Sequence, residues 1–283
     1  DRYGCDSEGR SGVAVVQVGT AGLRRRLDLV RTALQEVLAP DAVIDRTSPS
    51  VAQTEGFVVD PRLTFGAMPT ALSFRERGLK FELPLELGQK TGFYFDQRDL
   101  RAKIESLSKG ARVLDGFCYV GAIALSAARG GAASVLALDE SMPALEVGAA
   151  CARLNGLSVK FERADLRRDL GRRAAAGERY DLIVLDPPKL APKRGDRAGA
   201  ASYQTKLIES AVPLCDPGAL MVVCSCSSAI GTGDLARCLA IGARRAGRNA
   251  LVLERLGQGA DHPVPAAFPE GVYLSTLVAE IRP

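Results

Sequence analysis

The stretch Asp181-Leu182-Ile183-Val184-Leu185-Asp186-Pro187-Pro188-Lys189 joins a continuous apolar run to an abrupt polar turn. Such a run is typical of a strand that is buried on both faces of a parallel sheet. Proline disfavours the helical region for the residue before it, so Asp186 is expected to be extended at the strand's carboxyl end. Ligands of open α/β sheets bind at that edge. The stretch therefore favours an α/β sheet with a carboxylate beside its ligand crevice, and an ordinary Asp-Pro turn is the alternative.

Predicted strands and helices alternate regularly before and after this stretch. The predicted strands are 112–114, 134–138, 159–161, 180–185, 220–224, 251–255 and 273–281. The predicted helices between them are 122–129, 143–154, 166–176, 200–214 and 232–245. This alternation predicts an α/β domain with a mostly parallel, twisted sheet and helices on both faces. No full helix precedes 273–281, so this strand is predicted to run antiparallel at the edge of the sheet.

The first third of the chain shows a different pattern. Residues 13–18 favour a strand, and leucine and valine at three- and four-residue spacing predict a helix over 22–38. Alternating apolar residues favour a β-hairpin over 71–85. We therefore predict a small α+β domain over residues 1–87, followed by the α/β domain over residues 88–283.

The composition is typical of a globular protein with a small basic excess. Lys and Arg number 37 against 33 Asp and Glu, a balance that permits an RNA partner without requiring one. No apolar run reaches the roughly 18 residues that a membrane span needs. Seven cysteines without disulfide spacing and a single histidine favour free thiols, a cytoplasmic location and no metal site.

A strand, a glycine-containing turn and a helix start follow one another over Val113–Gly121. Glycine lets a ligand approach the backbone, and a helix N-terminus offers unpaired N–H groups. Asp115, Asp139 and Asp165 follow three successive predicted strands, where Asp139 can accept from both ribose hydroxyls and Asp165 from an adenine amino group. Because the G-x-G-x-x-G spacing is missing, a nucleoside ligand is favoured over a nicotinamide dinucleotide. Three unrelated acids at strand ends are the alternative.

Several motifs resemble those of one known family. The stretch Gln89–Arg98 is similar to the K-T-G-F-x-x-D-Q-R signature of bacterial large-subunit (23S) rRNA cytosine-5 methyltransferases, which are class I S-adenosylmethionine-dependent enzymes. Further matches, in the family's order, are Asn155–Leu157, Asp186–Lys189, Ser225–Ser227, Asp261–Pro263 and Phe268–Gly271. The turn Asp115–Cys118 departs from the family's usual Asn-Cys-Phe-Ser. The family's RNA-binding PUA domain is also missing, which we interpret, together with the absent initiator Met, as a truncated start.

The resemblance implies a fold, a cofactor and a partner. The fold is a Rossmann-like class I methyltransferase domain, and the cofactor is S-adenosylmethionine (SAM). The partner is large-subunit rRNA or its assembly intermediate, with no membrane or metal, and a homodimer is left open. The residues indicated for cofactor binding are Lys90, Thr91, Tyr94, Gln97, Arg98, Asp115, Phe117, Gly121, Asp139, Asp165 and Asp186.

Methylation of cytosine at carbon 5 makes specific chemical demands. Carbon 5 is a poor nucleophile, so a thiolate must first add to carbon 6 while an acid holds nitrogen 3. The resemblance matches Cys226 as the nucleophile, and Asp186 is the candidate acid. Cys224 is the competing nucleophile, because strand alternation would place it on the same side. We favour Cys226 because it lies past the predicted strand, where it can be exposed.

Three further residues are candidates for the same chemistry. Lys189 is a candidate cation beside the thiolate. His262 and Glu270 are both candidates for the acceptor of the carbon 5 proton, and the sequence does not decide between them.

Contact with RNA phosphates is expected from Lys193, Arg194 and Arg197, which follow the Asp186 turn, although charge runs are usually solvated loops.

Three other functions remain open from the sequence. The first is methylation of another RNA position, such as guanine nitrogen 7. The second is a SAM- and RNA-binding scaffold without turnover, and the third is methylation of a small molecule.

Overall fold

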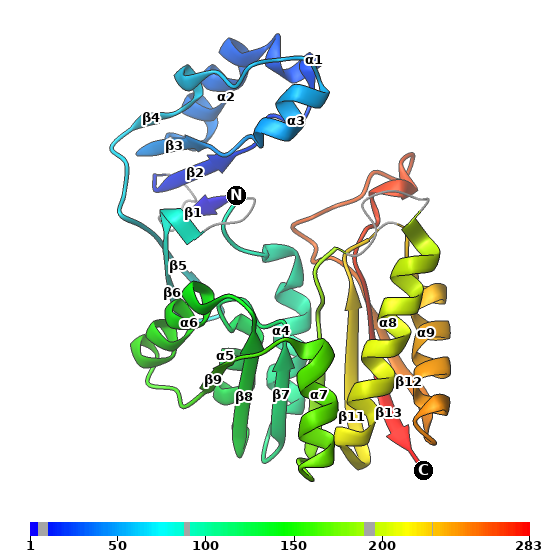
Figure 1. Cartoon of the computed structure of the whole chain (residues 1–283). Coiled ribbons are helices and arrows are strands. Elements are labelled where there is room, and N and C mark those ends of the chain that lie inside the picture. The colour runs from blue at the N-terminus through cyan, green and yellow to red at the C-terminus, as the bar shows by residue number, and fades with distance from the viewer. Residues whose placement is uncertain (5–10, 88–90, 190–195, 228) are drawn as a thin grey trace. The chain divides into compact units, whose positions relative to one another are not determined.

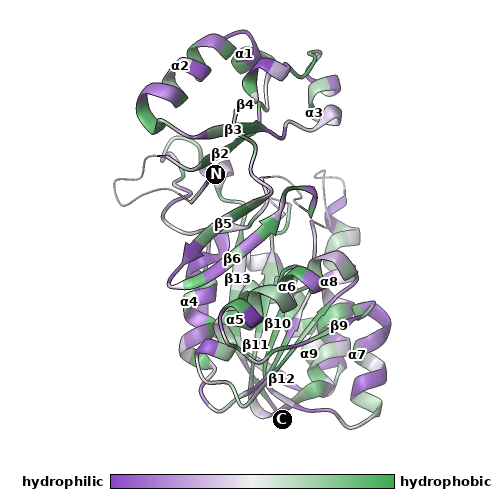
Figure 2. Ribbon diagram, turned by 90° about the vertical axis from the view of Figure 1, so that its left-hand side faces the viewer, coloured by the Kyte–Doolittle hydropathy of each residue, from purple (hydrophilic) through white to green (hydrophobic). Residues whose placement is uncertain are grey.

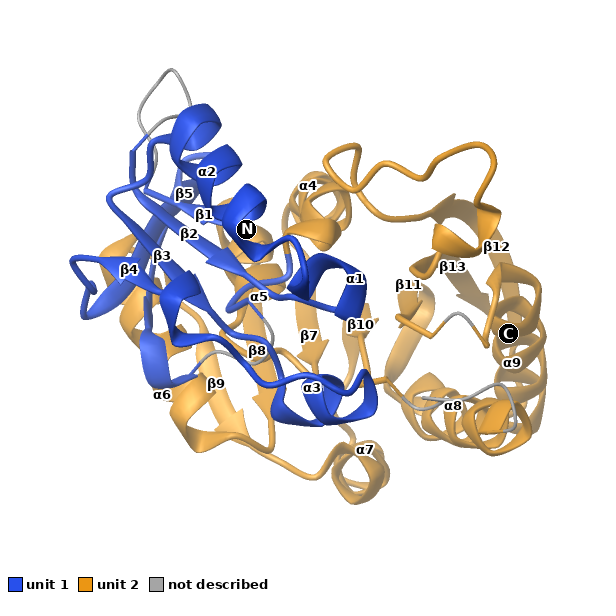
Figure 3. Cartoon of the chain, turned by 90° about the horizontal axis from the view of Figure 1, so that it is seen from above, with its two compact units in different colours: residues 1–94 blue, residues 95–283 orange. Residues whose placement is uncertain are grey.

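The computed structural model describes residues 1–4, 11–87, 91–189, 196–227 and 229–283. The chain forms two compact units, Asp1–Tyr94 and Phe95–Pro283, which Figure 3 colours separately. The division lies at Tyr94, beyond the predicted boundary at residue 87.

The first unit is a small α+β unit. Its four-stranded sheet has the order β1 (Arg2–Tyr3), β2 (Val13–Val16), β3 (Ala42–Asp45) and β4 (Phe65–Gly66). Its helices are α1 (Ala21–Arg24), α2 (Leu27–Leu38) and α3 (Pro49–Thr54). The predicted hairpin is present as β5 (Ala71–Glu76) and β6 (Leu79–Pro84). Its inward rings Phe74 and Phe81 stack with their centroids 5.1 Å apart, which secures the pairing of the two strands.

The helix predicted over 22–38 is interrupted. Helix α1 ends at Arg24 and α2 begins at Leu27, because Arg26 has φ −109° and ψ 25°, outside the helical region. The interruption lets Leu27 be buried with Val18 and Leu63 in a small core. The spacing of apolar residues did not predict the interruption, because it depends on the tertiary contacts of Leu27.

The second unit is a doubly wound α/β unit (Figure 1). Its seven-stranded sheet has the order β12-β13-β11-β10-β7-β8-β9. In chain order the strands are β7 (Arg112–Gly116), β8 (Ser134–Asp139), β9 (Lys160–Arg163), β10 (Tyr180–Leu185), β11 (Cys215–Ser225), β12 (Asn249–Leu256) and β13 (Ser275–Arg282). The helices are α4 (Arg98–Leu107), α5 (Ala122–Arg129), α6 (Met142–Leu154), α7 (Leu166–Ala175), α8 (Arg197–Ala211) and α9 (Thr232–Arg245). Helix α4 was not predicted.

Two hydrophobic cores cover the two faces of this sheet, because successive residues of a strand point to opposite faces. On one face, Leu114, Ile183 and Met221 pack with apolar residues of α7, α8 and α9. On the other face, Val113 and Leu182 pack with residues of α4, α5 and α6. Figure 2 shows hydrophobic strands enclosed by helices that carry hydrophilic stretches.

The direction of the last strand is as predicted, but its place is different. Strand β13 runs antiparallel to both β11 and β12 and therefore lies inside the sheet, with β12 at the edge. Nearly all of Ser275–Arg282 is buried, whereas exposed and half-buried residues alternate along Asn249–Leu256. Strand β12 fits the edge of the sheet, because only one of its two faces is packed against other residues.

The order of the strands reverses between β7 and β10. The chain passes from β7 through β8 to β9 and then returns to place β10 on the other side of β7. Leu185 of β10 pairs with Gly116 of β7 and with Val223 of β11, so these three strands end close together. A crevice at such a reversal is the usual ligand site of open α/β sheets.

Candidate active site

The residues at the ends of β7 and β10 are joined by hydrogen bonds. The Asp186 N–H donates to the Gly116 carbonyl (3.3 Å), and Asp186 Oδ2 accepts from Gln97 Nε2 at 2.9 Å. Gln97 is almost fully buried just before α4, whereas Asp186 is half-buried. The structure thus presents Asp186 at the crevice with one carboxylate oxygen held from behind. Gln97, predicted to bind the cofactor, contacts this acid directly.

The turn after β7 has an unusual backbone. Phe117 and Tyr119 have φ of 64° and 51°, and Gly121, which precedes α5, has φ 68°. A Cβ at Gly121 would lie 2.5 Å from the ring of Phe161, so a larger residue would need both a strained backbone and a displaced ring. The order of strand, turn and helix is the one that the Val113–Gly121 pattern predicted, whereas a ligand contact of the N–H groups at the start of α5 stays a prediction.

Asp115 is a buried carboxyl with one oxygen unused. Its Oδ2 accepts from the Ala124 N–H at 2.9 Å, and its Oδ1 has no hydrogen-bond partner among the described residues. Burial raises the pKa of Asp115 well above its ordinary value, the hydrogen bond from Ala124 opposes this, and the nearby charges of Asp186 and Asp139 add to the rise. A buried acceptor without a donor calls for a partner outside the protein, and a cationic amine would suit it best.

Asp139 and Asp165 stand at the ends of the next two strands, as predicted. Asp139 accepts from the N–H groups of Tyr119 (2.8 Å) and Ser141 (2.9 Å), one on each oxygen. Each of these oxygens keeps a second lone pair for a hydroxyl group. Asp165 caps α7 and pairs with Arg167 at 3.2 Å, and the hydrogen bond from this guanidinium lowers the pKa of Asp165. The adenine contact of Asp165 stays a prediction.

The two candidate nucleophiles have different surroundings. Cys224 is fully buried in β11, where its sulfur accepts from the Thr276 hydroxyl at 3.5 Å and burial raises its thiol pKa well above the ordinary value. Cys226 lies past the end of β11 and is partly exposed. Strand spacing and rise place the Cα atoms of Cys226 and Asp186 roughly 8 Å apart, provided both segments stay extended. These positions favour Cys226 as the reactive thiol.

The segment before β13 is attached to the residues that precede α4. The Tyr273 hydroxyl donates to Asp96 Oδ2 (2.8 Å), and the Gly259 N–H donates to the Asp96 carbonyl (2.9 Å). Burial raises the pKa of Tyr273, and so do its hydrogen bond to Asp96 and the charges of Asp96, Asp261 and Cys226. Ser275 of β13 pairs with Ser225 of the antiparallel strand β11, and this register brings the segment of Tyr273 beside that of Cys226. Tyr273 was not predicted as a site residue, because its only signal in the sequence was a place at the start of a predicted strand.

The two candidate proton acceptors differ in exposure. His262 is partly buried, with Nδ1 3.2 Å from Asp261 Oδ1, and Asp261 also pairs with Arg98 at 3.1 Å. Arg98, predicted to contact the cofactor, thus meets the same loop as His262. Glu270 is exposed in a short 3-10 helix, Pro269–Gly271.

The remaining predicted site residues fall into three groups. Lys189 is exposed after the two prolines. Lys90, Lys193 and Arg194 lie outside the described residues. Thr91 and Tyr94 belong to the first unit, where the Thr91 hydroxyl donates to Asp1 and the Thr91 carbonyl accepts from Tyr3. The roles of these residues stay predictions. Within the described part of the chain, no His, Cys, Asp and Glu group is arranged to hold a metal ion, and every helix is too short or too polar to cross a bilayer.

The strand order, the glycine turn after β7 and the acids at the strand ends define a Rossmann-like class I methyltransferase fold that uses SAM. The profile of the family described as S-adenosylmethionine-dependent methyltransferase matches residues 63–271. "Ribosomal RNA large subunit methyltransferase I" of Serratia proteamaculans is 36% identical over 271 residues, covering 94% of this chain and 68% of the relative. Its namesake in Aeromonas hydrophila is 35% identical over 273 residues, covering 95% and 69%. The chain belongs to this family of methyltransferases.

Solved structures show the same fold at low sequence identity. The structure of SMU.776 complexed with SAH has a TM-score of 0.80 at 17% identity, over 95% of this chain and 69% of that one. The tRNA m1G37 methyltransferase of M. jannaschii has a TM-score of 0.66 at 15% identity, over 97% and 74%.

The residues at the crevice fit SAM. Bound SAM would have an amine for the unused oxygen of Asp115 and a ribose diol for Asp139, and the glycine turn would let it approach the backbone. Asp115→Asn is expected to weaken SAM binding at least about tenfold, because a hydrogen bond to a charged group contributes roughly 1.5–3 kcal/mol. Titration calorimetry of the ligand-free protein measures this change, and an unchanged affinity would contradict the assignment.

The same variant should change how stability depends on pH. Because burial raises the pKa of Asp115, the stability that its protonated form contributes is present at low pH and is lost as the pH rises through the folded-state pKa. Asp115→Asn lacks this carboxyl, so its free energy of unfolding should fall less than that of the unmodified protein as the pH rises. Urea unfolding of both proteins across a pH series, without SAM, measures the difference.

Proposed function

We propose that this protein transfers a methyl group from SAM to carbon 5 of a cytosine in large-subunit rRNA, through a covalent adduct with Cys226. The RNA substrate is inferred from the name shared by the relatives, which this chain matches over about two thirds of their length. The cytosine chemistry is inferred from one juxtaposition. The partly exposed thiol of Cys226 follows β11, two residues beyond the position opposite Asp186, whose carboxylate follows the neighbouring strand β10.

Each residue has a defined part in the proposed reaction. The thiolate of Cys226 adds to carbon 6, and Asp186, protonated or sharing a proton, bonds nitrogen 3 so that the added electron pair moves towards carbon 5. Carbon 5 would take the electrophilic methyl group that SAM supplies, and the bond from sulfur to this methyl group would break to release S-adenosylhomocysteine. A base then removes the carbon 5 proton, and the carbon–sulfur bond breaks to return the thiolate.

For the base we favour His262 over Glu270. His262 is partly buried on the segment that Tyr273 and Asp96 hold together, and its Nδ1 lies 3.2 Å from Asp261 Oδ1 without a hydrogen bond among the described residues. Glu270 is exposed to solvent in the short helix Pro269–Gly271. We further propose residues 1–87 as the domain on the RNA side.

Mapping of the modified nucleotide tests the proposed function. Purified protein, labelled SAM and an unmodified large-subunit rRNA transcript should yield one labelled 5-methylcytidine in nuclease digests read by mass spectrometry. Label on a guanine would support methylation at another RNA position. SAM and RNA binding without transfer would support a scaffold, and either result would refute the proposal.

Gln97 is proposed to position Asp186 rather than to bind the cofactor alone. Gln97→Met keeps the size of the side chain but removes the donor to Asp186 Oδ2, so kcat should fall roughly tenfold to a hundredfold while SAM affinity stays unchanged. Gln204→Met is the matched control, because Gln204 is also buried and donates to a backbone carbonyl, that of Cys224. Weaker SAM binding with unchanged kcat would support the cofactor role instead.

A further inference from the structure

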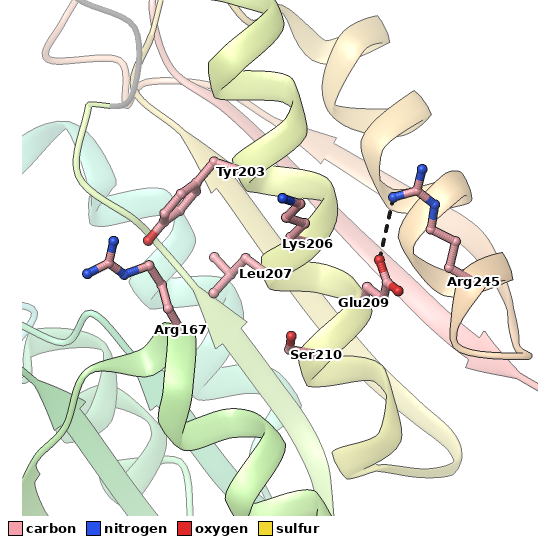
Figure 4. A pocket seen from close by; sticks show the side chains of 7 residues that line it. All are labelled: Arg167, Tyr203, Lys206, Leu207, Glu209, Ser210 and Arg245. Carbon is pink, nitrogen blue, oxygen red and sulfur yellow. Dashed lines mark ion pairs between the residues drawn. The ribbon is translucent and has the colours of Figure 1, made fainter.

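A groove of about 540 Å³ lies on the outer side of the second unit, among α7, α8 and α9 (Figure 4). Helix α8 forms its floor with Tyr203, Lys206, Leu207 and Ser210, which share one helical face at spacings of three and four residues. The size falls within the range of sites that hold a small molecule or a nucleotide. None of these residues takes part in the proposed methyl transfer.

Positive charge predominates in the groove. Lys206 on α8 is joined by Arg167 from α7, which also pairs with Asp165 at 3.2 Å, and by Arg245 from α9, and Glu209 is the one acid among the residues that line the groove. Lys206 is exposed and has no ion pair among the described residues. The Arg245–Glu209 pair is long, at 3.5 Å, and both side chains are solvent-exposed. Exposed pairs of this kind contribute little to stability, so their cations are available to an incoming anion.

Tyr203 adds a flat apolar surface beside these charges. The ring is partly buried against the core beneath α8, and burial raises the pKa of its hydroxyl, so it stays a neutral donor at physiological pH. In Figure 4 the ring lies next to Arg167 at one end of the groove. A ring and a guanidinium together can hold a ribose or a base, while the neighbouring ammonium contacts a phosphate.

The groove continues along the helix that follows the Asp186 turn. Helix α8 begins at Arg197, and Lys206 lies nine residues further, or about 14 Å along the axis. An RNA chain that places one nucleotide at the carboxyl ends of β10 and β11 can therefore extend along α8. The groove therefore has cations for phosphates and an aromatic ring for a sugar or base, and it lies on the helix that leads away from the Asp186 turn.

We propose that this groove is a second contact for the RNA substrate, which holds the sugar-phosphate backbone apart from the nucleotide that is methylated. The inference rests on the proposed RNA substrate, but not on the chemistry at Cys226. Binding without SAM therefore tests it, and a failure to methylate cytosine would leave this test intact.

The decisive measurement is the affinity of the whole chain for an unmodified large-subunit rRNA transcript over a salt series. Lys206→Glu should weaken binding roughly tenfold at low salt and make the plot of log affinity against log salt shallower by about 1, as expected for one lost phosphate contact. Tyr203→Leu should weaken binding without changing this slope, because it removes stacking rather than charge. SAM affinity should be unchanged in both variants.

Lys109→Glu is the matched control. Lys109 is exposed in the turn after α4, without a partner among the described residues, and its replacement changes the net charge equally. Equal weakening by Lys109→Glu and Lys206→Glu would overturn the proposal, since net charge alone would explain it. The proposal would also fail if Lys206→Glu converted a dimer to a monomer in ultracentrifugation without altering RNA affinity, because the groove would then join two copies of the chain.

Discussion

Cys226→Ala is expected to abolish methyl transfer to RNA, with a fall in kcat of at least about 10³-fold. The variant removes the nucleophile whose addition to carbon 6 activates carbon 5 in the proposed reaction. Cys226 is partly exposed past β11, so the change should leave folding and SAM affinity intact. Transfer is measured with labelled SAM and unmodified rRNA, and SAM binding by calorimetry.

Cys224→Ala is the matched control for this result. Cys224 lies two residues away in the same chain segment, but it is fully buried and its sulfur accepts a hydrogen bond from Thr276. Its loss should lower the free energy of unfolding by roughly 1–2 kcal/mol while transfer persists. The opposite pattern, with activity lost in Cys224→Ala and kept in Cys226→Ala, would show that we chose the wrong thiol. Activity in both variants would exclude the covalent mechanism.

Asp186→Asn should have the second largest effect, a fall in kcat of about 10²–10⁴-fold. Asparagine has the same shape and can still accept from Gln97, so the crevice should keep its geometry. It can neither share a proton with nitrogen 3 nor carry the compensating charge when the thiolate adds. Single-turnover kinetics at saturating SAM separate this loss from any change in cofactor binding.

Asp181→Asn controls for the loss of a carboxylate from the same strand. Asp181 stands at the other end of β10 and pairs with Arg112 at 2.9 Å, and the hydrogen bond from Arg112 lowers its pKa. The control should reduce the Tm slightly and leave turnover unchanged. Equal losses of kcat in the two variants would point to a general effect on β10 and would argue against a role for Asp186 in the chemistry.

Local patterns in the sequence determined much of this protein. Apolar runs and helical spacing predicted the alternation of strands and helices in the second unit, because each pattern depends on neighbours a few residues apart. The polar turn after Leu185 likewise predicted that Asp186 would stand at the carboxyl end of a strand. The position of Cys226 just past a strand was predicted for the same reason.

Only the tertiary structure decided which distant residues meet. Gln97 reaches Asp186 across 89 positions of sequence, and Tyr273 reaches Asp96 across 177. The place of β13 inside the sheet and the interruption before Leu27 also depend on which apolar faces find cover. Such contacts depend on how whole helices and strands pack against one another. The periodicity of the sequence indicates only which face of a helix or strand is apolar, and not which other element that face contacts.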